Sequence, residues 1–147
     1  MKNLLLMIFL LVIPLSILAQ SADSVAIKEA SLDYADGWYS GDPVRMERSI
    51  NPDLDKAFPE RINTSGGITF RYARYSLLVE GACTKLGFTE VSKRKLSVKI
   101  INISGDFAKV RINSARFNDY LHRVRVDNQL KIVNIIYFQL KNVYETI

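Results

Sequence analysis

The chain has 147 residues, with 20 lysines and arginines against 15 aspartates and glutamates, a formal net charge of +5, one histidine and one cysteine. These counts exclude an intramolecular disulfide, a cysteine zinc cluster and zinc sites built from two or three histidines. The phosphate-binding loops GxxxxGK[ST] and GxGxxG are both absent from the sequence. The sequence therefore predicts no metal and no cofactor.

The first residues have the pattern of a signal peptide. Lys2 is the one early charge, residues 4–18 are almost wholly apolar, and polar sequence begins at Gln20. This run falls short of the about 20 apolar residues that a transmembrane helix needs. Cleavage after Ala19 fits the preference for a small residue before the cut, so residues 1–19 are expected to be removed. We expect a periplasmic or secreted protein with no stable membrane anchor after cleavage; an uncleaved anchor is the alternative.

Residues 20–147 contain no linker, repeat or low-complexity run, which predicts one domain. The positive charge is spread along the chain, with one cluster at residues 93–95. Such a cluster is more typical of a solvated surface than of a phosphate site, and together with export it predicts no nucleic-acid partner. No histidine lies near Cys83 in the sequence, and Cys83 is predicted to be a small buried apolar residue.

The first half of this region reads mainly as helix. Apolar and aromatic residues recur every three to four positions over residues 21–40, which predicts an amphipathic helix. Gly41 would end it in the left-handed conformation, and Asp42 would cap a second helix with Pro43 at its first position. The second helix is expected to stop before Pro52.

Strands dominate the second half. After a short turn and a loop over residues 58–67, the pattern predicts a strand at residues 68–72 and a third helix at residues 74–86. The alternation then predicts a strand from Leu96 with a bulge at Ile101, because its phase shifts by one residue there. Three further strands are expected, the last two joined by a turn at Asp127-Asn128; they cover residues 108–113, 117–126 and 129–140.

Helices followed by an antiparallel meander predict an α+β fold with the helices gathered on one face of the sheet. A long bent sheet that curls around an amphipathic helix leaves a conical hollow. The last predicted strand has apolar residues on both faces, since Ile135 and Tyr137 alternate with Ile136 and Phe138. One face is taken by the helices, so the other is expected to bury against a second copy in a homodimer.

Several segments resemble a known family. Residues 34–42, Met46 and residues 51–54 are similar to the start of the putative lumazine-binding branch of the nuclear transport factor two-like superfamily, and residues 117–122 and 130–134 are similar to its closing strands. The resemblance runs from about residue 22 to residue 138. It implies a cone of three helices packed on a curved antiparallel sheet of about four to six strands.

That superfamily contains isomerases, dehydratases, cyclases and many domains without catalysis, so the resemblance implies a fold more strongly than a reaction. The branch usually carries a histidine before the proline that ends its second helix, where this chain has Asn51. The lost ionisable residue favours a binding role over a catalytic one.

Two sets of residues on the predicted strand at 117–126 could do chemistry, and only one can face inward. Tyr120 and His122 share one face and could polarise or protonate a ligand carbonyl. Asp119 takes the other face and could act as a base among apolar side chains, the arrangement that the resemblance implies from the superfamily's isomerases. The alternatives are a surface or structural role for the histidine and a turn or capping role for the aspartate.

Three functions fit these observations. The favoured one is an exported domain that binds a small hydrophobic or aromatic ligand in a conical pocket. The second is an isomerase, dehydratase or cyclase that works without a cofactor, with Asp119 or His122 as acid or base. The third is a dimeric interaction domain whose cone is filled, with Tyr34 and Trp38 as core residues. The candidate ligand-binding residues are Tyr34, Trp38, Tyr120, His122 and Asn134.

Overall fold

The computed structural model describes residues 23–62 and 64–139. A first helix spans residues 23–40. It is followed by nine further elements: α2 (Pro43–Ser49), β1 (Ile50–Arg61), β2 (Ile68–Arg74), α3 (Tyr75–Cys83), α4 (Val91–Arg94), β3 (Ser97–Ser104), β4 (Phe107–Asn113), β5 (Phe117–Val126) and β6 (Gln129–Gln139). Within the described residues, no helix is long and apolar enough to cross a membrane. The predicted signal peptide lies outside the described residues.

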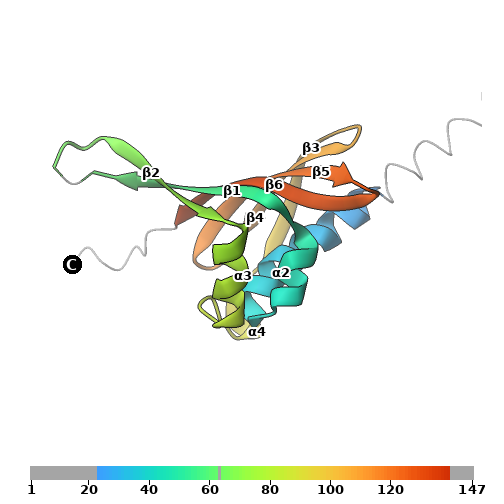
Figure 1. Ribbon diagram of the computed structural model, residues 1–147, viewed down its shortest axis with the longest axis horizontal. Helices are drawn as coiled ribbons and strands as arrows, with labels where there is room; N and C mark the ends of the chain where they lie inside the picture. Colours follow the sequence, from blue (N-terminus) through green and yellow to red (C-terminus); the bar gives the residue numbers. More distant parts are fainter. Residues whose placement is uncertain (1–22, 63, 140–147) are drawn as a thin grey trace, which may run out of the picture.

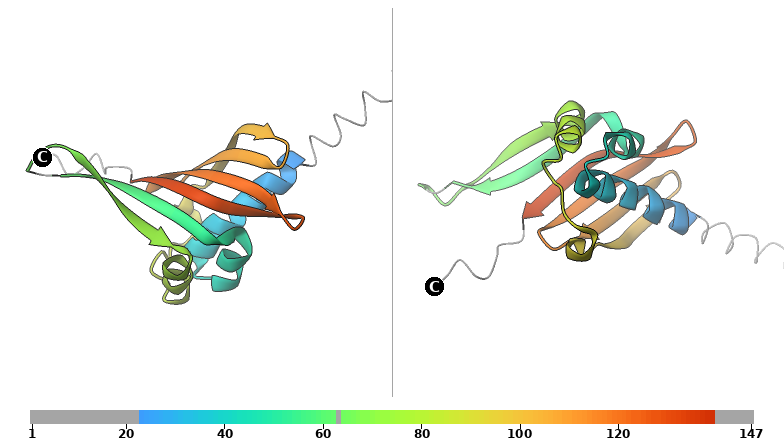
Figure 2. Two further views of the ribbon diagram at one scale, coloured as in Figure 1. Left: turned by 45° about the horizontal axis from the view of Figure 1, so that its top comes forward. Right: turned by 90° about the horizontal axis from the view of Figure 1, so that it is seen from below.

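The strands form one six-stranded curved sheet in the order β2-β1-β6-β5-β4-β3. All neighbouring pairs are antiparallel except β1 and β6, which run parallel. The first helix, α2 and α3 lie against one face of the sheet, here called the inner face (Figures 1 and 2). The hairpin of β1 and β2 extends well beyond the helices (Figure 1). The predicted α+β class, with helices on one face, is therefore confirmed.

The corner between the first two helices forms as the sequence predicts. Gly41 has a φ of +67°, the left-handed conformation that glycine adopts without steric cost. The Asp42 carboxylate accepts a hydrogen bond of 3.1 Å from the backbone N–H of Arg45, and Pro43 occupies the first helical turn. This corner fixes the direction in which α2 returns toward the sheet.

Of the loop predicted up to Gly67, residues 62 and 64–67 are confirmed. The turn predicted from Leu54 and the loop predicted over residues 58–61 are wrong. The structure has the long strand β1 there, which begins at Ile50 and runs through Pro52. Pro52 is tolerated because it falls in the register irregularity between Ile50 and Asp55, where β1 is not paired residue by residue with β6. Beyond that point β1 pairs with both β6 and β2.

Other element boundaries also differ from the prediction. The third helix, α3, ends at Cys83 instead of reaching residue 86, and the short helix α4 was not predicted. The prediction that Cys83 is buried is wrong, because its side chain is exposed at the end of α3. A four-residue helix carries too little periodicity to be recognised from sequence.

Bulges set the final register of the sheet. The predicted irregularity in β3 is confirmed between Ile100 and Asn102. A second one, in the pairing of β5 with β6 between His122 and Arg123, was not predicted. Because of it, Ile132 and Ile135 are both fully buried, although strict alternation would place them on opposite faces.

The core lies between the inner face of the sheet and the first two helices. Its centre is a row of side chains that crosses four strands from β1 to β4, formed by paired residues of neighbouring strands. Ile135, Leu121 and Val110 are fully buried members of this row. The remaining member, on β1, is Lys56, which is 5% exposed. A buried lysine in an otherwise aliphatic row needs a specific partner.

Candidate functional site

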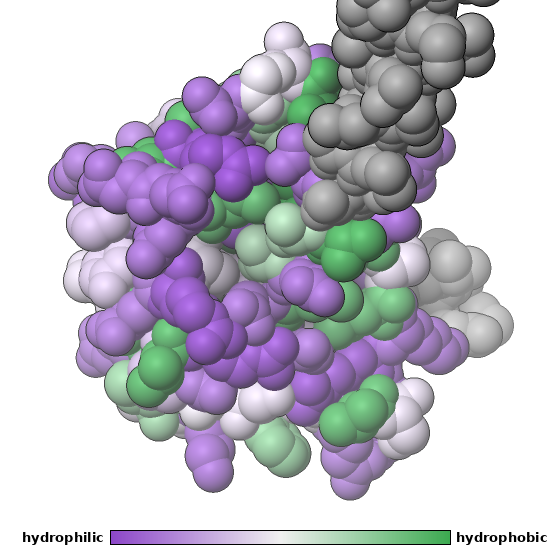
Figure 3. All heavy atoms as spheres, turned by 90° about the vertical axis from the view of Figure 1, so that its right-hand side faces the viewer, coloured by the Kyte–Doolittle hydropathy of each residue, from purple (hydrophilic) through white to green (hydrophobic). Residues whose placement is uncertain are grey.

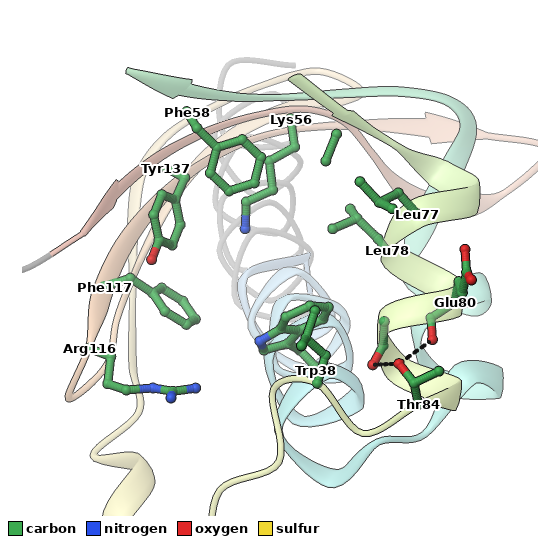
Figure 4. Close-up of a pocket in the computed structure, with 13 residues that line it drawn as sticks. Trp38, Lys56, Phe58, Leu77, Leu78, Glu80, Thr84, Arg116, Phe117 and Tyr137 are labelled. Carbon is green, nitrogen blue, oxygen red and sulfur yellow. Dashed lines mark hydrogen bonds between the residues drawn. The ribbon is translucent and has the colours of Figure 1, made fainter. Parts of the chain in front are cut away.

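A cavity of about 540 Å³ opens between the inner face of the sheet, the end of the first helix and α3. Figure 4 shows Lys56, Phe58, Phe117 and Tyr137 on the sheet side, opposite leucines of α3. Trp38 of the first helix lies across the space from the aromatic strand residues. This volume lies within the range of about 300–1,000 Å³ that small-molecule sites occupy.

Lys56 extends from β1 into the aromatic side of this cavity (Figure 4). Four aromatic rings surround its ammonium nitrogen, Nζ. The distances from Nζ to the ring centroids are 4.7 Å for Tyr137, 5.3 Å for Phe58, 5.4 Å for Tyr34 and 5.6 Å for Phe117. The electron-rich faces of such rings attract a cation at these distances and partly replace the water that Lys56 has lost.

Two polar groups hold the ammonium from behind. Nζ of Lys56 donates to the phenol oxygen of Tyr34 at 2.7 Å and to Oδ2 of Asp119 at 3.2 Å. The Tyr34 hydroxyl in turn donates to the same Oδ2 at 2.8 Å. Asp119 is fully buried, and its other oxygen, Oδ1, has no hydrogen-bond partner among the described residues. We call Lys56, Asp119 and Tyr34 the buried trio.

Burial shifts the proton affinities within the buried trio. It raises the pKa of the Tyr34 phenol well above its ordinary value, and the charge and hydrogen bond of Asp119 raise it further. Tyr34 therefore stays a hydrogen-bond donor at neutral pH. Burial lowers the pKa of the Lys56 ammonium, although Asp119 opposes this effect. Two opposing effects therefore act on Lys56. Burial favours its neutral amine, whereas the Asp119 carboxylate favours its charged ammonium.

Two glycines shape the wall that carries Trp38. A Cβ atom on Gly87 would overlap the indole Nε1, and one on Gly81 would lie 2.7 Å from Cζ3 of the same ring. The indole therefore packs directly against the backbone at both positions. Larger residues at either glycine would push Trp38 into the cavity or out of its place.

Arg116 and Glu80 supply charge at the rim of the cavity. The Arg116 guanidinium lies 5.8 Å from the centroid of the Tyr39 ring and donates to the Gly87 carbonyl at 3.5 Å. Within the part of the chain that the structure describes, Arg116 forms no ion pair with a carboxylate. The rim is thus polar, while the interior is aromatic and aliphatic.

The predicted site residues fall on two opposite faces. Asp119 faces inward and belongs to the buried trio, so its alternative role as a turn or capping residue is wrong. Trp38 lines the cavity, and Tyr34 supports Lys56 from behind without lining it. The first helix thus presents both aromatic residues toward the sheet, as the sequence predicts.

Tyr120, His122 and Asn134 lie on the outer face, so they do not line the cavity as the sequence analysis expected. His122 and Asn134 are paired across β5 and β6, and His122 packs against Phe107 with ring centroids 5.7 Å apart. Asn134 donates to the Asp55 carbonyl at 3.2 Å. A separate hollow of about 370 Å³ on this face is lined in part by Tyr120 and His122.

Lys56 is the central site residue that the sequence analysis missed, because the segment from Leu54 to Phe58 was interpreted as a short turn and not as part of a strand. The alternation of Leu54, Lys56 and Phe58 was the available signal, since residues two apart share one face of a strand. A charged residue at the central position obscured that pattern. Phe117 and Tyr137 were placed on strands correctly but were not recognised as cavity residues.

The other hollow on the helix side is chemically different. It has a volume of about 420 Å³ and is lined by charged groups that include Asp33 and Arg48, which form an ion pair of 2.8 Å. Figure 3 views the molecule from the end where the first helix begins, and hydrophilic side chains dominate that surface. Among the described residues, no group of three histidine, cysteine or acidic side chains gathers to hold a metal. The aromatic cavity is therefore the candidate ligand site.

Comparisons with known proteins agree with this architecture. A family model described as putative lumazine-binding matches residues 22–138. Among curated proteins, no sequence matches the chain significantly. Several solved structures share the fold, all at low sequence identity.

A nuclear transport factor two-like protein of unknown function from Silicibacter pomeroyi superposes with a TM-score of 0.63 at 14% identity, covering 82% of this chain and 98% of its own. A similar protein from Shewanella baltica gives 0.62 at 17% identity, with coverages of 83% and 97%. A ketosteroid isomerase-like protein from Erwinia carotovora atroseptica gives 0.51 at 11% identity, with coverages of 80% and 96%. At such identities the similarity shows the fold alone.

Proposed function

We propose that this chain, which belongs to the family described as putative lumazine-binding, binds a small hydrophobic or aromatic molecule in the cavity beside Lys56. The observation that carries the proposal is the position of the Lys56 ammonium in an aromatic-lined cavity of about 540 Å³. Ligand sites commonly combine an apolar lining with a few placed polar groups. Here Lys56 supplies the polar group inside, and Arg116 supplies a second one at the rim.

The hydrogen bonds of Lys56 indicate which polar group the ligand carries. A lysine ammonium has three N–H donors, and two of them are taken by Tyr34 and Asp119. No described residue accepts a hydrogen bond from the third, so it can bind an acceptor atom of the ligand. Because Asp119 already balances the charge of Lys56, a neutral acceptor such as a carbonyl or hydroxyl oxygen fits better than a carboxylate, whose charge would be buried without compensation.

Acid–base catalysis without a cofactor is the second candidate. The observation that favours it is Asp119, whose buried Oδ1 accepts no hydrogen bond from residues 23–62 or 64–139 and so retains the capacity to accept a proton. An enzyme of this kind would use Asp119 as the base and leave His122, on the opposite face, without a role. The third possibility, a filled cone, is disfavoured by the volume of the cavity.

The setting that we propose is outside the cytoplasm, after removal of residues 1–19. It rests on the apolar run and the polar onset at Gln20. We also propose that two copies pair through the outer face, where Phe70, Tyr72 and Phe138 are about half exposed or more. The family assignment implies neither proposal, and each has its own test. The intact mass of the mature chain tests the removal of residues 1–19, and the mass of the protein in solution tests the pairing of two copies.

A fluorescence titration tests the ligand proposal. The probe is 6-propionyl-2-(dimethylamino)naphthalene, a neutral aromatic ketone whose emission shifts to the blue in an apolar site. We expect saturable binding with a blue shift, together with quenching of the chain's one tryptophan, Trp38. In the variant Leu77→Trp, a larger side chain enters the cavity from α3, so binding should weaken at least tenfold by probe emission.

The matched control is Val44→Trp, which adds the same side chain on an exposed part of α2 away from the cavity. It should bind as the unmodified protein does. Equal weakening in both variants, or no saturable binding to the unmodified protein, would contradict the proposal. Turnover of a candidate ketone that is lost in Asp119→Asn while binding is retained would favour the catalytic alternative.

A further inference from the structure

Lys56 is buried, unlike the other lysines that the structure describes, yet it still lines a cavity. We propose that its amine reacts with the carbonyl group of a bound aldehyde or ketone and holds that ligand as a reversible imine. This inference rests on the proposed binding function and adds a covalent step to it. The ligand class it names is an apolar aromatic or aliphatic carbonyl compound.

Geometry places the reacting atoms together. A ligand carbonyl oxygen that accepts the third Lys56 hydrogen bond places its carbon beside Nζ. Once the ammonium has lost a proton, a small shift of the ligand brings this carbon to about 3–3.5 Å from Nζ, the separation at which attack begins. The apolar part of the ligand then lies along Trp38 and the leucines of α3 (Figure 4). Binding therefore converts an encounter in solution into a reaction between neighbouring groups.

The step balances with the groups present. The ammonium passes a proton to Asp119, and the nitrogen lone pair attacks the carbonyl carbon while the C=O π electrons move to oxygen. Nitrogen loses a second proton, and the oxygen takes up two in total and leaves as water as the C=N bond forms. A protonated imine then replaces the ammonium. In sum, one ammonium and one carbonyl compound give one iminium ion and one water molecule, with no oxidant or reductant.

Asp119 and Tyr34 suit this exchange in two ways. The iminium keeps the positive charge of the ammonium, so Asp119, which has given up its proton again by the end of the reaction, is its counter-ion. The Tyr34 hydroxyl, between the amine and the carboxylate at 2.7 and 2.8 Å, provides a relay for the protons that move. Burial also lowers the pKa of Lys56, which increases the fraction of neutral, nucleophilic amine at neutral pH.

Reductive trapping tests the inference on the full chain. The purified protein is incubated near neutral pH with 2-naphthaldehyde and sodium cyanoborohydride, which reduces an imine to a stable amine. Intact mass and peptide mapping then locate the naphthylmethyl group. We expect Lys56 to be labelled at least about tenfold faster than any other lysine, because burial lowers the pKa of its ammonium and the cavity holds the aldehyde beside it.

Two controls separate this reaction from general lysine chemistry. The variant Lys56→Arg keeps the positive charge beside Asp119 but has no primary amine, so the fast label should disappear. Lys99→Arg, at an exposed position of β3, should leave it unchanged. Naphthalene-2-methanol, which has the same ring system without the carbonyl, should protect Lys56 by competition, and this measurement needs no variant.

The outcomes distinguish the two proposals. Labelling spread evenly over the lysines, with saturable binding of the ketone probe intact, overturns the covalent step and leaves the binding function standing. Absence of both fast labelling and saturable binding overturns both. Fast labelling of Lys56 that naphthalene-2-methanol suppresses supports both.

Discussion

The polar residues on the two faces of β5 differ in their burial. On the inner face, Asp119 and Arg123 are fully buried. On the outer face, Tyr120 and His122 alternate with them along the same strand and keep part of their surface in solvent. A side chain's role here depends on the register of the strand more than on its residue type, since a shift of one position would exchange the two sets.

The consequence is a difference in how strongly each residue depends on its neighbours. An inward carboxylate loses its hydration and is stable only with a partner, which Lys56 and Tyr34 provide. An outward imidazole keeps access to water and needs no such partner. The inner face therefore carries the polar groups that could react with a ligand. It also carries the buried charges whose loss of a partner would lower the stability of the fold most.

Breaking the ion pair should give the largest effect. Lys56→Met leaves the Asp119 carboxylate buried without its counter-ion, so we expect a loss of about 3–5 kcal/mol in the free energy of unfolding. The double variant Lys56→Met with Asp119→Leu removes both charges and should recover much of that loss. Urea denaturation followed by circular dichroism measures both values.

His122→Ala is the matched control on the outer face of the same strand. It should change the free energy of unfolding by no more than about 0.5 kcal/mol in the monomer. A loss for Lys56→Met no greater than that for His122→Ala would mean that the ion pair contributes nothing to stability. The contrast drawn between the two faces would then be wrong.

A smaller effect is expected at the wall of the cavity. Gly87→Ala places a methyl group where the Trp38 indole now lies, so the ring must move, at a cost of about 1–3 kcal/mol. The emission of Trp38 should shift because its surroundings change. Gly67→Ala, where a new Cβ would meet first the Ser65 hydroxyl at 3.3 Å, should leave both the stability and the emission nearly unchanged.

Much of the fold could be predicted from the sequence because its local signals agree. The strands after Leu96 show a clear hydrophobic period. The corner at Gly41 and Asp42 and the turn at Asp127-Asn128 have residues suited to their backbone, and both residues of that turn have positive φ. Strand β1 could not be recognised in this way, because Pro52 and the charged Lys56 contradict the pattern of a central strand. Its stability comes from pairing with β2, the other strand of its hairpin, and with β6, which lies far away in the sequence.

The site was predicted only in part for the same reason. Asp119 was singled out from its own strand, but its partner Lys56 lies 63 residues away along the chain. The unpredicted bulge between His122 and Arg123 changes the register of β6, and no local signal in the sequence marks it. Residues brought together by distant pairing are thus the least accessible to pattern analysis.

The smallest effect on stability, and the largest on assembly, is expected on the outer face. Phe70, Tyr72 and Phe138 form an outer aromatic patch, with exposed fractions of 51%, 64% and 47%. They lie on the same face, because the Tyr72 partner Ala57 pairs with Ile136, two residues before Phe138. Exposing such a patch to water is unfavourable, and covering it with a second copy lowers the free energy of the assembly.

We therefore expect about twice the monomer mass by light scattering at micromolar concentration for the unmodified protein, and the monomer mass for Tyr72→Ser with Phe138→Ser. Each protomer should stay folded, because neither side chain belongs to the buried core. Val91→Ser, which removes an exposed apolar side chain from α4, is the control and should remain dimeric. A monomer mass for the unmodified protein across the accessible concentrations would exclude pairing through this face.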